Sequence, residues 1–167
     1  SPINGRLRAL VPAVTADLAD RGYDLPVFWG NRNAPPLLAD TVAGMRDAGI
    51  RRALAWVASP YSSFSTCRQY REDLDTACAS TGPDAPLIDR IRPHHDHPGL
   101  IETAADRLRE ALAVLGNGPG GDAHLLFSAH SIPCDQATIC DYAEQIDEAA
   151  GLVAGRLSDR FRRPAVV

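Results

Sequence analysis

Residues 25–58 read LPVFWGNRNAPPLLADTVAGMRDAGIRRALAWVA, and this stretch sets the expected fold. Its apolar start at residues 25–29 predicts a short buried strand, which a polar turn follows. A proline pair then opens a predicted helix that ends before Gly49, and residues 52–58 predict a second buried strand. This strand, helix, strand order favours parallel strands joined by a right-handed crossover.

The same alternation continues on both sides of this stretch. Helical spacing of apolar residues and short apolar runs predict helices at 3–21, 66–80, 99–115 and 138–161, and strands at 123–128 and 165–167. Residues 82–97 interrupt the pattern with prolines and histidines, so we place a domain boundary there. The glycine-rich loop at 116–122 lacks the trailing Lys-Ser/Thr of a phosphate-binding loop. The expected fold class is α/β, with parallel sheets flanked by helices on both faces.

Composition excludes several classes of protein. The chain has 167 residues and a net charge of −4, whereas a nucleic-acid-binding surface needs a clear basic excess. No apolar run reaches the roughly 18 residues of a membrane span, so we expect no membrane-spanning segment. The four cysteines are too few for a disulfide scaffold, which favours a reducing cytoplasm.

Ligands in doubly wound α/β folds bind at the carboxyl ends of the strands. Three segments follow predicted strands in this way, at residues 30–33, 59–70 and 128–133. The last contains His130 directly after an apolar run. An imidazole can be neutral near pH 7, so a rim histidine is suited to act as a base or a metal ligand. Position alone also fits a histidine that only caps the strand or bonds within the loop.

Four motifs, taken together, resemble those of one enzyme family. They are SPING at 1–5, VFWGNRN at 27–33, SPYSSFSTCRQY at 59–70 and LLFSAHSIP at 125–133. Each is weak alone, but the ordered set resembles ferrochelatases of the actinobacterial, coproporphyrin type and covers essentially the whole chain. The resemblance implies a lyase-class enzyme of heme and porphyrin biosynthesis that inserts ferrous iron, its substrate, into a porphyrin.

The resemblance also implies a class II chelatase-like fold with two similar domains and the porphyrin in the cleft between them. Residues 1–92 would then form the later part of the first domain, and residues 93–167 the beginning of the second. The chain starts without Met, and the family's acidic partner of the histidine would follow Val167. We therefore expect an internal fragment that holds about half of the active site, in a protein of unknown oligomeric state.

Site residues follow from the resemblance residue by residue. His130 would face the metal and accept a pyrrole proton, hold iron, or do both in sequence. Ser1 and Tyr70 would position the porphyrin through their hydroxyl groups. Arg32 would pair with a porphyrin propionate or serve a structural role. The resemblance further implies that Cys140 is one ligand of a [2Fe–2S] cluster. Such a cluster needs four thiolates, and in the family the other three lie near the C-terminus, so it would form only in a longer chain.

Two further features leave alternatives open. The histidines of residues 94–97 are almost contiguous, which disfavours a shared metal ion because zinc ligands are usually two to five residues apart. A related chelatase for cobalt or iron in another tetrapyrrole remains an alternative function, as does a non-catalytic porphyrin-binding remnant. The remnant would keep porphyrin binding after His130→Ala and would insert no metal.

Overall fold

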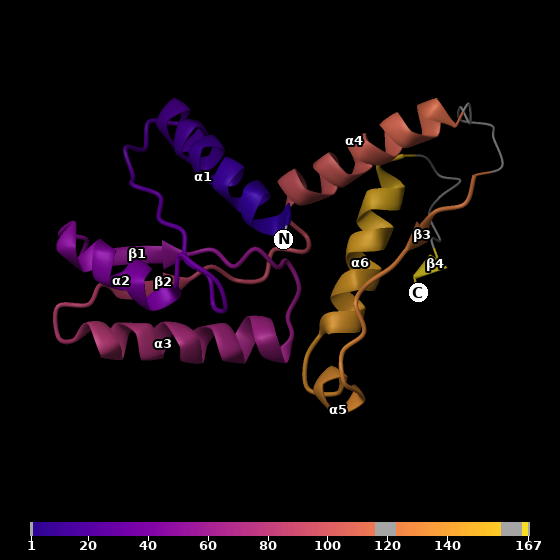
Figure 1. Cartoon of the computed structure of the whole chain (residues 1–167). Coiled ribbons are helices and arrows are strands. Elements are labelled where there is room, and N and C mark those ends of the chain that lie inside the picture. Colours follow the sequence, from indigo (N-terminus) through magenta and orange to yellow (C-terminus); the bar gives the residue numbers. More distant parts are fainter. Residues whose placement is uncertain (1, 116–122, 158–164, 167) are drawn as a thin grey trace. The chain divides into compact units, whose positions relative to one another are not determined.

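The computed structural model describes residues 2–115, 123–157 and 165–166. The chain divides into two compact units, which Figure 1 shows with their elements labelled. The N-terminal unit comprises Ser1–Ala55 and Tyr70–Arg90, and the C-terminal unit comprises Trp56–Gln69 and Ile91–Val167. Across the described residues, no helix is both long enough and apolar enough to cross a membrane.

The first helix, α1, spans Pro2–Asp20 and confirms the helix predicted at residues 3–21. It ends where the Gly22 N–H donates to the carbonyl of Ala19 at 2.9 Å. Gly22 has a φ of 85°, a left-handed conformation that glycine adopts without steric cost. The predicted stop signal therefore works through backbone geometry.

Helices α2 and α3 pack against each other in the N-terminal unit. α2 spans Leu38–Asp47 and α3 spans Tyr70–Thr81. Val42 of α2 is buried, as are Leu74 and Ala77 of α3. These apolar side chains give the two helices a shared face and hold the start of α3 in a defined place.

Strands β1, Arg52–Ala55, and β2, Leu87–Arg90, pair in parallel. Figure 1 shows them side by side. The parallel direction is confirmed, although β1 is shorter than the strand predicted at residues 52–58. β2 lies within residues 82–97, where the sequence predicted no strand. The apolar pair that opens β2 is too short to mark a strand beside so many prolines.

The sequence predicted a strand at residues 25–29, and this prediction is wrong. Among the described residues no strand pairs with this segment, and Pro26 has no N–H to donate. Leu25 is 55% exposed, so the apolar run is not uniformly buried. The chain instead reaches Asn31, which forms an isolated parallel bridge with Leu37.

The helix predicted at residues 66–80 has two parts. A π-helical segment, η1, spans Phe64–Gln69 and leads directly into α3. The backbone N–H of Thr66 donates to Ser63 Oγ at 3.1 Å, as a helix-capping serine accepts from the first turn. The helical segment therefore starts slightly earlier than predicted.

Two helices form the core of the C-terminal unit. α4 spans Pro98–Val114, and its start is capped by His97, whose Nδ1 accepts from the Gly99 N–H at 3.1 Å. α6 spans Tyr142–Gly155 and packs on α4. The buried cluster between them consists of Ile101, Ala105, Ala149 and Val153. Its small alanines allow the two helices to approach closely.

The helix predicted at 138–161 corresponds to α6 and is shorter. A separate short helix, α5, Cys134–Ala137, precedes it, and residues 158–161 lie outside the described residues. Strands β3, Leu126–Phe127, and β4, Ala165–Val166, pair in parallel. They confirm shortened forms of the last two predicted strands, while the glycine-rich loop and Val167 lie outside the described residues.

Candidate functional site

His130 lies in the loop between β3 and α5, and its side chain is exposed. Its Nδ1 is 2.7 Å from the carbonyl oxygen of Ser131. A carbonyl oxygen only accepts hydrogen bonds, so Nδ1 must carry the hydrogen and donate it. The neutral ring then keeps its lone pair on Nε2. This nitrogen is the atom able to take up a proton or to bind a metal ion.

Tyr142, the first residue of α6, also holds this turn, through the backbone carbonyl of His130. The hydroxyl group of Tyr142 donates to the carbonyl oxygen of His130 at 2.9 Å. The ring of Tyr142 packs edge-on against that of Tyr61, with centroids 6.0 Å apart and planes at 81°. Partial burial raises the pKa of Tyr61, and Tyr142 adds to this shift. Sequence reasoning missed Tyr142, and its only signal was an aromatic residue at a helix start.

A second candidate group lies within the N-terminal unit. Arg32 forms an ion pair with Asp73, and its guanidinium lies over the ring of Tyr70, 5.1 Å from the centroid. The Arg32 side chain is 20% exposed, so this cation–π contact is partly shielded from water. The structure thus brings together Arg32 and Tyr70, two residues that the sequence predicts at the site. It also adds Asp73, whose carboxylate neutralises the positive charge of Arg32.

A pocket of about 210 Å³ lies beside this group, between α2 and α3. Arg32 and Asp73 line it together with Leu38 and Ala77. Small-molecule sites usually measure about 300–1,000 Å³. The pocket is thus smaller than the usual range for a small-molecule site, although polar groups lie at its wall.

The remaining predicted residues differ in what the structure shows. Ser1 lies outside the described residues. Cys140 is half-buried, and its thiol donates to the carbonyl of Gln136 at 3.2 Å. Within the described part of the chain, no three His, Cys, Asp or Glu side chains are grouped to hold a metal ion.

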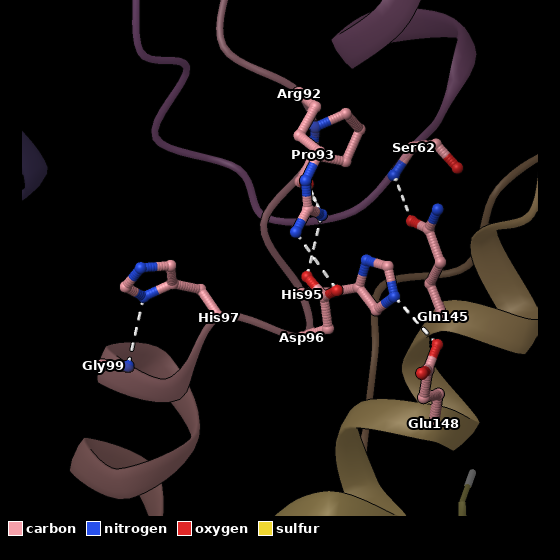
Figure 2. A network of polar contacts seen from close by, with 9 residues as sticks. All are labelled: Ser62, Arg92, Pro93, His95, Asp96, His97, Gly99, Gln145 and Glu148. Atoms are coloured by element: carbon pink, nitrogen blue, oxygen red, sulfur yellow. Dashed lines mark hydrogen bonds and ion pairs between the residues drawn. The ribbon is translucent and has the colours of Figure 1, made fainter.

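The side chains of residues 94–97 point to different partners, as Figure 2 shows for three of them. His95 is buried, and its Nε2 lies 3.0 Å from Glu148 Oε2 on α6. His97 caps α4, and Asp96 pairs with Arg92 at 2.8 Å. The histidine-rich stretch is therefore a structural joint between α4 and α6.

His94 has a further partner. Its ring packs on that of Trp56 with centroids 5.5 Å apart, and partial burial lowers the pKa of this imidazole. Each of the four side chains at residues 94–97 therefore has contacts of its own.

Similarity to known proteins identifies the family. The family model named ferrochelatase matches residues 1–166. The chain is 46% identical over 157 residues to coproporphyrin III ferrochelatase of Mycolicibacterium vanbaalenii, covering 92% of this chain and 46% of that protein. It is 50% identical over 139 residues to the protein of that name from Frankia alni, covering 82% and 35% respectively. A ferrochelatase of Rhodopirellula baltica is 42% identical over 154 residues, covering 92% and 44%.

The chain therefore belongs to the ferrochelatase family. This membership confirms the predicted class II chelatase-like α/β fold, and the parallel strands and helices of the structure agree with it. The chain spans about half the length of the curated relatives that it matches.

Proposed function

We propose that the protein carrying this chain inserts ferrous iron into a porphyrin, coproporphyrin III, in heme biosynthesis. Family membership supports this activity, and several similar proteins carry the name coproporphyrin III ferrochelatase. The observation that carries the proposal is the exposed His130 ring, whose Nδ1–H bond to Ser131 leaves Nε2 open. An open, unprotonated imidazole nitrogen is what proton removal or iron delivery requires.

Iron insertion exchanges two protons of the porphyrin for one metal ion. The porphyrin loses two pyrrole protons, and Fe²⁺ binds the four ring nitrogens. The flat macrocycle must bend before its lone pairs can meet the metal, and a pocket that binds the bent form more tightly lowers the barrier. His130 takes up one pyrrole proton or holds the incoming iron. A protonated imidazole cannot bind a metal, so these two roles are successive rather than simultaneous.

Tyr70 and Ser1 act in this proposal as porphyrin-positioning residues that use their hydroxyl groups. The Arg32 guanidinium over the Tyr70 ring restrains the ring before a porphyrin arrives. Asp73 neutralises Arg32, so a propionate must compete with this carboxylate for the guanidinium. We therefore propose that Arg32 mainly orients Tyr70, with propionate binding as its secondary role.

The domain organisation is part of the same proposal. Residues 1–92 form the later part of one chelatase domain, and residues 93–167 form the start of a second, similar one. In each domain further parallel strands and helices on both faces complete the two-stranded sheets seen in this chain. The protein works in the cytoplasm. If a [2Fe–2S] cluster assembles, Cys140 supplies one of its thiolates and a longer chain supplies others.

Insertion is tested with the product of the complete open reading frame that contains this chain. The protein is incubated without oxygen with coproporphyrin III and Fe²⁺, and the loss of free-base porphyrin fluorescence is followed. We expect iron coproporphyrin to accumulate over many turnovers. Porphyrin binding without metal insertion would favour a binding remnant instead. Faster insertion of Co²⁺ into another tetrapyrrole would favour a different chelatase of this fold.

A further inference from the structure

Two side chains hold the loop that carries His130, namely the imidazole of His130 itself and the hydroxyl group of Tyr142. The carbonyl oxygen of His130 accepts the Tyr142 hydroxyl at 2.9 Å, and that of Ser131 accepts the His130 ring at 2.7 Å. Consecutive carbonyl groups of the turn are thus fixed by two side chains. A turn held at both points keeps the imidazole in one orientation, although the side chain is exposed.

Tyr142 is itself fixed by the C-terminal unit. It is the first residue of α6, whose later turns bury Ile146, Ala149 and Val153. Its ring rests on Tyr61, in the loop before η1. Gln145, one turn further along α6, accepts the backbone N–H of Ser62 at 2.7 Å, which Figure 2 shows. The start of α6 therefore fastens two separate loops, one of which bears His130.

We propose that Tyr142 is the positioning residue of His130: its hydroxyl holds the backbone of the histidine turn so that Nδ1 stays protonated and Nε2 stays open. The inference rests on the proposed role of His130 in iron insertion. Tyr142 does not touch the porphyrin or the iron in this account. Without its hydroxyl, the carbonyl of His130 bonds to water, the turn loosens, and the ring loses its fixed hydrogen-bond partner.

Tyr142→Phe tests the inference, because phenylalanine keeps the ring contact with Tyr61 and removes only the donor. Tyr23→Phe is the matched control, since it removes a hydroxyl from an exposed tyrosine of the other unit. The first measurement is histidine ring nitrogen NMR of the 167-residue chain at about pH 8.5, where imidazole is neutral. His130→Ala assigns the resonance among the five histidines.

We expect wild type and Tyr23→Phe to show His130 with the hydrogen on Nδ1. Tyr142→Phe should shift the ring towards a mixture of both tautomers. In the complete protein, kcat for iron insertion should fall roughly three- to tenfold in Tyr142→Phe, the range that losing one hydrogen bond gives, while KM for coproporphyrin III stays within about twofold. Equal urea midpoints would exclude unfolding as the cause.

Unchanged His130 nitrogen shifts in Tyr142→Phe would overturn the inference, whatever the activity. A KM that rises while kcat is constant would also overturn it, because that pattern indicates a porphyrin contact. If the wild-type protein inserts no iron, the proposed function fails. The NMR comparison still decides the positioning role in that case, so the two failures are distinguishable.

Discussion

Truncation of Ile101 to alanine probes the packing that holds α6 in place. Ile101 is 2% exposed and lies in the buried cluster with Ala105 and Val153. The change removes three carbon atoms, worth about 2.4 kcal/mol at about 0.8 kcal/mol each. A cavity that does not collapse adds to this loss, and isoleucine-to-alanine changes in cores cost about 2–5 kcal/mol. Because the neighbours include small alanines on two rigid helices, we expect about 3 kcal/mol.

The assay is amide hydrogen exchange of α4 and α6, converted to the free energy of local opening. This readout is specific to the C-terminal unit, whereas a single melting curve would mix both units. Val114→Ala on the same helix is the control, since Val114 is 89% exposed and its change should stay within about 0.5 kcal/mol. A loss below about 1 kcal/mol in Ile101→Ala would refute this packing, as would an equal loss in the control.

Three further predictions concern single residues. Gly30→Ala should destabilise the N-terminal unit by about 1–3 kcal/mol in urea unfolding, because the new Cβ would lie 2.9 Å from Thr41 Oγ; an unchanged midpoint would contradict the close approach. His97→Ala removes the cap of α4 and should lower the stability of the first helical turn by about 1 kcal/mol. Amide hydrogen exchange of that turn measures the loss, and exchange rates equal to those of wild type would contradict it. Burial raises the pKa of the Cys78 thiol, so at pH 8 a smaller fraction of it is ionised than in a cysteine without such a shift. Alkylation at pH 8, followed by mass spectrometry, should therefore be slower at Cys78 than at exposed Cys134, and equal rates would contradict this.

Local signals in the sequence predicted the helices well. The stop at Gly22 and the proline that opens α4 are encoded by single residues, so both helix ends appear close to where the sequence predicts them. Strands were harder because a strand exists only with a partner. Residues 25–29 have the composition of a strand but no pairing strand among the described residues, while β2 has a weak pattern and a partner in β1.

The candidate site was predictable in its residue types but not in its contacts. The apolar run before His130 predicted a residue that follows a strand, and the structure places His130 in the loop after β3. No sequence pattern revealed that Tyr142 reaches the carbonyl of His130, since that contact depends on where α6 begins. The pairing of Arg32 with Asp73 joins residues 41 positions apart, so it too needed the folded chain.

The most direct test of the account is the initial rate of iron insertion into coproporphyrin III by the complete protein with His130→Ala. The matched control is His124→Ala, which removes an exposed histidine from the segment before β3. We predict a rate at least roughly a hundredfold below wild type for His130→Ala, the scale of a lost proton-transfer group, with porphyrin binding retained and the control unchanged. An insertion rate in His130→Ala equal to that of wild type would contradict the central claim that this histidine moves the proton or delivers the metal.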